Sequence, residues 1–361
     1  MNKMMMGVSA LVIASMAGAA AAQEWSVRVA GGSVAGFAYI DSDTAEHDTA
    51  LITRTDLTVN ARLVADNGLT FGSSLTLLAK GNDDIVQDGY DASVSGSFGR
   101  VRVGQFSGPQ RSLLVRTPRT TFAGAGRSAG ILFDGAYNRG DTPANGIFDD
   151  RGANTGFSRK IEYTTPTFSG FKAGIAYAPN SAVNNDAATS IAAPRNNEGI
   201  EFGANYTGNF GDFSIALGGG YTEFLNDGRT FDNGYAIGGE VGFAGFALGV
   251  SYSAAEARGN ASDLAMVAVG GRYRTGPWSF GVSYGMNLDG PSLAAGSSNA
   301  GNTARNAEDD YGISLAADYA LAPGVVVGAQ FEYSQSDRSR TAGANSGSDA
   351  FAVGVLMGLS F

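Results

Sequence analysis

The sequence predicts an all-β fold: a transmembrane antiparallel up-and-down barrel of sixteen strands with an inward-folded third outer loop. Three observations lead to this prediction. Apolar and polar residues alternate through most of the chain, which is the pattern of strands with one apolar face. Short turns interleave with long polar connections. Beyond residue 22, no apolar run approaches the roughly 20 residues that a membrane-spanning helix needs.

The first 22 residues have the composition of a secretory signal peptide. A positive start at Lys3 leads into a small and apolar stretch, Val8 to Ala22, and the chain turns polar at Gln23. The alanines that end the stretch fit a small-residue cleavage site. A membrane anchor would need about 20 uninterrupted apolar residues, whereas serines and a glycine interrupt this stretch. We therefore expect residues 1–22 to be removed and residues 23–361 to form the barrel domain.

The clearest strand is Leu51 to Val64, where leucine, valine, alanine and threonine occupy one parity and Arg54, Asp56 and Arg62 occupy the other. Fifteen further alternating segments have one apolar, aromatic-rich face. They centre near Val27, Leu75, Val94, Val103, Ile161, Ile175, Phe202, Ile215, Ile237, Leu248, Val269, Val282, Leu315, Phe331 and Val353. Many aromatic residues, such as Tyr206 and Tyr284, fall near the expected strand ends, where interfacial girdles belong.

The connections between these segments are also regular. Seven short turns alternate with eight long polar connections, and the long ones are 41–50, 81–89, 106–157, 179–198, 226–233, 256–262, 289–307 and 336–349. Barrels of the outer membrane have an even strand number, short periplasmic turns and long outer loops. A barrel of roughly sixteen strands is wide enough for an aqueous lumen. A soluble β-sandwich would have shorter and less uniform strands, and a solenoid would show a repeat of about 20–50 residues, which is not visible.

The third long connection, residues 106–157, is by far the longest segment without alternation. Loops of this length are uncommon and are usually functional or disordered. It contains apolar residues such as Leu113 and Phe122 that give it material to pack, which argues against disorder. It also carries six arginines and four aspartates, at positions 111, 116, 119, 127, 139 and 151 and at positions 134, 141, 149 and 150. We expect it to fold inward against the barrel wall.

With these features and a final alternating segment that ends in Phe361, the chain resembles the general bacterial outer-membrane porins, the Gram-negative trimeric family, in particular its alphaproteobacterial type. The resemblance covers the whole mature chain. It implies a homotrimer of sixteen-stranded barrels in the bacterial outer membrane, surrounded by lipid and lipopolysaccharide. It further implies that the third outer loop, residues 106–157 here, constricts the lumen.

The polar parity, which should face the lumen, is unevenly charged. Basic residues gather in the early strands, and the predicted pore-lining set is Arg28, Arg54, Arg62, Arg100 and Arg102. In porins that this chain resembles, such a cluster faces acidic residues of the folded loop, and a field crosses the pore. The matching acidic candidates are Asp134, Asp141, Asp149 and Asp150. Alternatively, some of the arginines pair with carboxylates and hold the loop in place.

Catalytic and metal chemistry have little support in the sequence. The chain has no cysteine and one histidine, His47, which falls in the expected first outer loop, so neither a thiolate nor a plausible histidine base is available. We expect no enzyme activity and no cofactor. Asp149 and Asp150 are candidate calcium ligands, since carboxylate oxygens suit Ca²⁺. Gly218 to Gly220 lies within a strand and is no phosphate loop, and inward glycines could let the folded loop approach the wall closely.

These observations predict a water-filled channel for passive diffusion of small hydrophilic solutes and ions, selective by pore width and lining charge. The net charge of −10 disfavours nucleic acid as a partner, and the excess acid outside the basic sector predicts a mild cation preference. Two alternatives stay open. A substrate-specific channel would carry an aromatic slide along the lumen, and the inward parity has few aromatics. A structural or adhesive surface barrel would not conduct.

Overall fold

The computed structural model describes residues 25–42, 45–80, 85–118, 153–180, 198–225, 231–259, 263–289, 311–336 and 348–361. The expected signal peptide, residues 1–22, lies outside the described residues. So does the middle of the third connection, residues 119–152.

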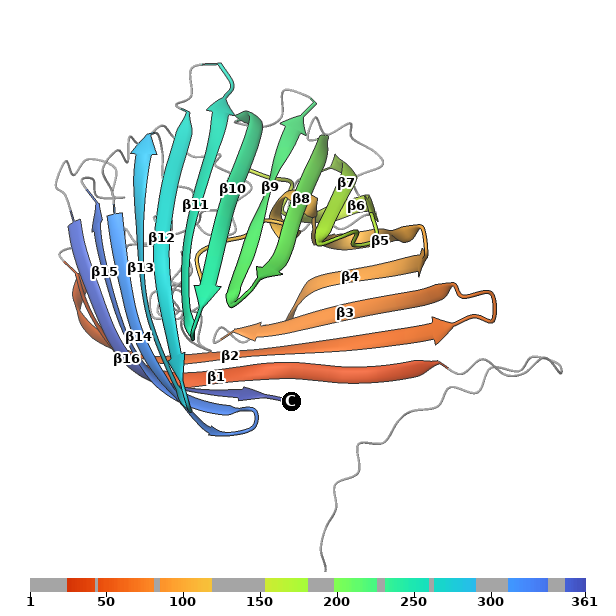
Figure 1. The fold of residues 1–361 in the computed structure, drawn as a ribbon. Helices are drawn as coiled ribbons and strands as arrows, with labels where there is room; N and C mark the ends of the chain where they lie inside the picture. The colour runs from red at the N-terminus through yellow and green to blue at the C-terminus, as the bar shows by residue number, and fades with distance from the viewer. Residues whose placement is uncertain are drawn as a thin grey trace, which may run out of the picture.

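Sixteen strands form one closed barrel in which each strand pairs with its sequence neighbours, and β1 closes against β16 (Figure 1). All of the pairs are antiparallel, so the predicted strand number and up-and-down topology are confirmed. The strands are β1 (Ser26–Ser42), β2 (Ala45–Val64), β3 (Thr70–Lys80), β4 (Ile85–Gly96), β5 (Gly99–Ser107), β6 (Phe157–Thr164), β7 (Phe171–Asn180), β8 (Gly199–Phe210), β9 (Phe213–Phe224), β10 (Phe231–Phe243), β11 (Phe246–Ala257), β12 (Leu264–Thr275), β13 (Trp278–Asp289), β14 (Tyr311–Ala322), β15 (Val325–Ser336) and β16 (Ser348–Ser360). One short helix, α1 (Pro109–Ser112), follows β5.

The last residue of the chain takes part in closing the barrel. Gly32 of β1 is paired with Ser360 of β16, and the backbone of Phe361 exchanges hydrogen bonds of 3.0 and 3.1 Å with the backbone of Gly31. The Phe361 ring lies against Gly31, where a Cβ atom would be 2.9 Å from it. The final aromatic residue therefore sits at the seam between the first and last strands.

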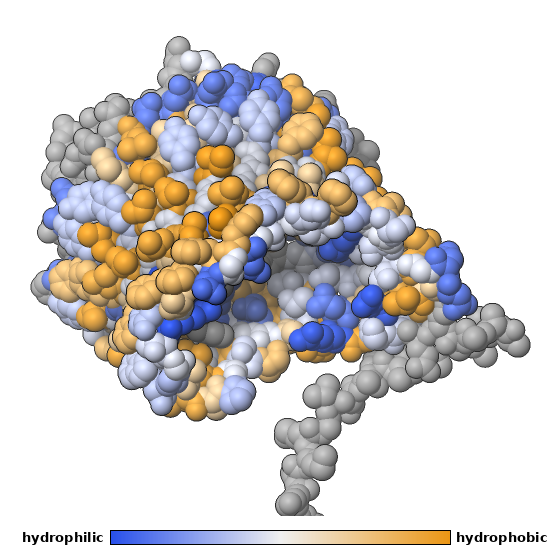
Figure 2. Space-filling model, viewed as in Figure 1, coloured by the Kyte–Doolittle hydropathy of each residue, from blue (hydrophilic) through white to orange (hydrophobic). Residues whose placement is uncertain are grey.

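The two faces of the wall differ as the alternation predicts. Leu51 and Val355 are 78% and 65% exposed, whereas their neighbours Ile52 and Leu356 are 1% and 5% exposed. Apolar residues cover much of the outer wall, and a hollow rimmed partly by hydrophilic residues opens on the same side of the molecule (Figure 2). A continuous exposed apolar face on a closed sheet suits lipid. In the described part of the chain no helix is long and apolar enough to span a membrane.

Aromatic side chains form cross-strand contacts near both ends of the strands. Near the short turns, Phe246 stacks on Tyr273 with ring centroids 4.3 Å apart. Near the opposite ends, Tyr311 lies 5.9 Å from Tyr284 and 6.0 Å from Tyr333. Such rows match the aromatic girdles expected at the two membrane interfaces.

The prediction that residues 41–50 form the first outer loop is wrong. Strand β2 begins at Ala45, and Tyr39 pairs with Thr49 and Ser42 with Ala45, so His47 belongs to a strand. At 20 residues, β2 is longer than the roughly 9–11 residues that cross a bilayer. Its polar end can therefore stay hydrogen-bonded beyond the membrane, where side-chain polarity no longer distinguishes strand from loop.

Candidate functional site: the inner wall of the barrel

The strand register places four of the five predicted arginines close together. Arg62, Gly72, Ser93 and Arg102 occupy one cross-strand row over β2 to β5, so the two arginine backbones lie about 14 Å apart. Arg28 pairs with Asn60 in the neighbouring row, two residues along β2. Arg100 is two residues from Arg102 on β5. We call Arg28, Arg62, Arg100 and Arg102 the basic wall.

Arg54 does not join this group. It lies eight residues from Arg62 on β2, which is about 27 Å along the strand, and its cross-strand partners are Val34 and Lys80. The sequence predicted that Arg54 faces inward but could not fix its depth. The register places it toward the long-connection end of the barrel, away from the basic wall.

The four arginines of the basic wall have different surroundings. Arg28 and Arg62 are exposed, and neither forms an ion pair with another described residue. Arg100 donates to Asp91 Oδ1 at 2.9 Å and keeps 43% of its side chain exposed. Arg102 is 15% exposed, donates to both oxygens of Glu162 at 2.7 and 3.1 Å, and has its guanidinium 3.7 Å from the centroid of the Phe106 ring. The charge of Arg102 is thus largely compensated, whereas that of Arg62 faces water.

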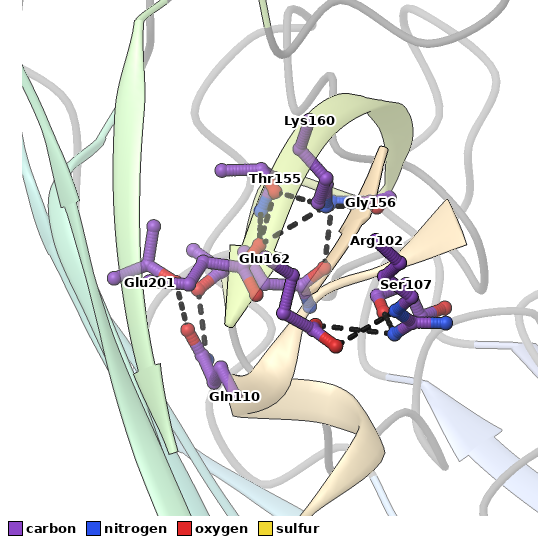
Figure 3. Close-up of polar contacts among 11 residues, drawn as sticks. Arg102, Ser107, Gln110, Thr155, Gly156, Lys160, Glu162 and Glu201 are labelled. Carbon is purple, nitrogen blue, oxygen red and sulfur yellow. Dashed lines mark hydrogen bonds and ion pairs between the residues drawn. The ribbon is translucent and has the colours of Figure 1, made fainter. Parts of the chain in front are cut away.

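A second group of polar residues fastens the beginning and end of the third connection to the wall (Figure 3). Lys160 of β6 is fully buried, and its Nζ donates to Thr155 Oγ1 at 2.5 Å and to the Gly156 carbonyl at 2.9 Å. The same Nζ lies 3.5 Å from Glu201 Oε1 on β8. Glu201 in turn accepts the backbone N–H of Thr155 at 2.8 Å.

Gln110 of α1 ties the two ends of the connection to each other. Its Nε2 donates to the Ala153 carbonyl at 3.0 Å, and its Oε1 accepts the hydroxyl of Thr222 on β9. All of these groups are buried, where an unpaired polar group costs about 1–3 kcal/mol. We call Gln110, Thr155, Lys160, Glu201 and Thr222 the clasp.

Residues 108–118, which we call the arm of the third connection, lie against the inner faces of the strands that follow β6. Helix α1 contacts β7, β8 and β9, and Figure 1 shows it behind these strands. At the other end of the connection, Ala153 packs in an apolar cluster with Phe224, Phe231 and Leu264. Both described ends of the connection therefore lie on the inner wall.

Sequence reasoning did not single out the clasp, although the alternation of strands β6 and β8 places Lys160 and Glu201 on the inward parity. Two opposite charges of one parity on β6 and β8 were the available signal. Between them runs β7, whose Ala176 lies in one row with Glu162 and Glu201, so only a small side chain stands between β6 and β8 there. Gln110 and Thr155 have no comparable signal, because their roles depend on the path of the chain.

The acidic candidates of the connection, Asp134, Asp141, Asp149 and Asp150, lie outside the described residues. Among the residues that are described, no group of three or more histidine, aspartate or glutamate side chains could hold a metal ion. The expected calcium pair, Asp149 and Asp150, thus stays a prediction.

Comparison with known proteins agrees with this architecture. The model of the family described as Gram-negative porin matches residues 7–339. Two mutants of the Rhodopseudomonas blastica porin have similar structures, with TM-scores of 0.57 and 0.59 and identities of 18% and 17%, covering 93% of this chain and 100% of each porin chain. OmpT of Vibrio cholerae without its loop L8 gives 0.58 at 16% identity, covering 93% of this chain and 99% of the other. No curated protein sequence matched the chain.

At these identities, the structural likeness supports the fold, while the family model spans nearly all of the chain. The closed barrel with an apolar outer face and a polar inner face is the architecture of an outer-membrane channel. The chain therefore belongs to the Gram-negative porin family and is an outer-membrane channel for passive diffusion.

Proposed function

We propose that this porin is a general diffusion pore for small hydrophilic solutes and ions, and that residues 106–157 form its narrowest part. The clasp carries the proposal. It binds both described ends of the connection to the inner wall through Gln110, Thr155 and Glu201. Because both described ends are fastened inside the barrel, the connection starts and ends on the inner wall, which supports a constriction formed by this segment.

The electrostatic part of the proposal concerns the basic wall. Arg28 and Arg62 are exposed and form no ion pair with another described residue, and Asp134, Asp141, Asp149 and Asp150 would face them from the connection. The excess acid elsewhere gives a mild cation preference. The proposal includes no reaction and no cofactor, with Asp149 and Asp150 as a candidate structural calcium site. It also includes removal of residues 1–22 and a homotrimer surrounded by lipid and lipopolysaccharide.

The test is single-channel conductance in planar bilayers under a salt gradient. In one variant, residues 119–152 are replaced by a short glycine–serine linker, which leaves the arm and the clasp intact. A control variant shortens residues 290–310, between β13 and β14, with the same linker. We expect large openings in groups of three for the natural chain, a larger conductance for the first variant, and no change for the control.

Three results would contradict parts of the proposal. A natural chain that inserts but does not conduct would favour a structural or adhesive barrel. A small conductance that one solute blocks would favour a substrate-specific channel. Equal conductance of the natural chain and the 119–152 variant would show that the connection does not limit the pore. The sign of the reversal potential decides the ion preference.

A further inference from the structure

Seven glycines of the inner wall lie beneath the arm. They are Gly174 on β7, Gly203 on β8, Gly218 and Gly220 on β9, Gly238 on β10, Gly249 on β11 and Gly270 on β12. They are also neighbours in the sheet: Gly174 pairs with Gly203 and Gly203 with Gly220, Gly218 pairs with Gly238, and Gly249 pairs with Gly270. The glycines thus form a nearly continuous track across six strands, which we call the seat.

Each glycine of the seat contacts a part of the arm where a side chain would need space. A Cβ atom on Gly203 would overlap the carbonyl group of Pro109, and one on Gly238 would overlap the carbonyl of Val115. A Cβ atom on Gly249 would lie 2.8 Å from Pro118 Cδ. The obstacle is a backbone carbonyl at Gly203 and Gly238 and a proline ring atom at Gly249. None of these can rotate out of the way as a flexible side chain could, so the arm would have to move away from the wall.

Backbone conformation does not explain these glycines. None of the seven has a positive φ angle, although ten other described glycines do. Glycine in the interior of a strand weakens the strand, and it often marks a place where another backbone approaches closely. Along the seat the approaching backbone is present in the structure. The requirement is therefore for space, and alanine can adopt the backbone angles of these positions.

We propose that the seat sets how far the arm stands from the wall, and thereby sets the width of the passage and the largest solute that it admits. The seven glycines are positioning residues for permeation. The arm covers β7 to β12, which leaves the passage beside the basic wall, where Arg28 and Arg62 are exposed. This inference rests on the proposed diffusion pore and adds the part of the wall that determines its width.

A disulfide can test the position of the arm independently of conductance, because the chain contains no cysteine. The Cβ position of Gly270 is 3.1 Å from Thr117 Cβ, close to the roughly 3.5–4.5 Å of disulfides. Thr117→Cys with Gly270→Cys should crosslink in the folded protein, seen by mass and gel mobility. The control is Thr117→Cys with Gly271→Cys, since Gly271 faces outward and should not crosslink.

Alanine variants test whether the seat sets the width. Gly203→Ala and Gly249→Ala should lower the single-channel conductance and slow the permeation of larger sugars in liposome swelling. Combining Gly249→Ala with Pro118→Ala, which removes the Cδ atom that Gly249 contacts, should restore both. Gly72→Ala is the matched control, because Gly72 also faces inward but its Cβ position meets only the Ser93 hydroxyl, at 3.0 Å, and the Ala61 carbonyl, at 3.7 Å.

The two proposals fail in different ways. A natural chain without conductance contradicts the diffusion pore, while the crosslink still reports where the arm lies. Absence of the Thr117–Gly270 crosslink in folded protein overturns the seat. So does conductance of folded Gly203→Ala that equals or exceeds that of the natural chain, because an arm pushed off the wall must narrow the passage.

Discussion

The inward positions of the strands differ between two parts of the inner wall of this porin. On β2 to β5 the inward positions carry long charged and polar side chains, and Arg62 is exposed to water. On β7 to β12 the inward positions are rich in glycine, and the arm covers them. In the proposed pore, an inward position therefore has one of two roles: it lines the passage, or it makes room for the chain that we propose narrows the passage.

The largest loss of stability is expected when the buried ion pair of the clasp, on the wall that the arm covers, is broken. Glu201→Gln removes the acidic partner of Lys160, whose side chain is fully buried. Breaking one partner of a buried pair costs about 3–5 kcal/mol, because the remaining charge is uncompensated. We expect a loss of this size in urea unfolding followed by circular dichroism, with noisier single-channel currents as the connection loosens.

Glu240→Gln is the matched control for this change. Glu240 lies 3.9 Å from Arg272, and its side chain is 28% exposed, so we expect a loss of at most about 1 kcal/mol. The double change Lys160→Met with Glu201→Leu should recover much of the stability, since apolar replacement of a whole buried pair is often neutral. Equal losses for Glu201→Gln and Glu240→Gln would mean that the clasp does not hold the connection.

A smaller loss of stability is expected at Arg102, which lies between the basic wall and the strands that the arm covers. Arg102→Gln leaves Glu162 without its two-point contact and the Phe106 ring without its cationic neighbour. We expect a loss of about 2–3 kcal/mol, because hydrogen bonds to charged groups are strong when largely buried. Arg100→Gln should cost about 0–1 kcal/mol, since Arg100 is 43% exposed. Urea unfolding of both variants compares them directly.

What the sequence could predict follows the same division. Strand number, topology and the two faces were predictable, because alternation recurs in sixteen segments and the fifteen connections between them alternate between short and long. The inward parity of Arg62 and Arg102 was also predictable. Their different roles were not predictable. Arg102 contacts Glu162 and Phe106, and these contacts depend on the strand register and on where β5 ends.

Residues of the clasp and the seat were even harder to predict from the sequence. The sequence suggested that inward glycines allow a close approach of the loop, but it could not say which strands were involved. That information lies in the path of residues 108–118, which have no periodicity of their own. Polar segments at the first outer hairpin were misassigned for a related reason: strand pairing such as Tyr39 with Thr49 continues beyond the membrane, where alternation is no longer required.

Gln110→Ala should produce a still smaller loss on the covered side. The change removes the hydrogen bond to Ala153 and the partner of the Thr222 hydroxyl, both in a buried environment. We expect about 1–2 kcal/mol in urea unfolding. Gln105→Ala, on the outward parity of β5, is the control and should stay within about 0.5 kcal/mol. A loss for Gln105→Ala as large as that for Gln110→Ala would remove the case for Gln110 as a tie.

The smallest effect on stability, within about 0.5 kcal/mol, is expected for Arg62→Gln on the open side. This variant should nevertheless shift the reversal potential toward cations more than Arg102→Gln does, because Arg62 is exposed and has no described ion-pair partner, whereas Glu162 already compensates Arg102. Raising the salt to 1 M should reduce the shift, since the screening length falls to about 3 Å. If Arg102→Gln changed selectivity more than Arg62→Gln, the passage would not run beside the exposed arginines. The arm would then have to leave a route along the covered wall, which the close contacts of the seat oppose.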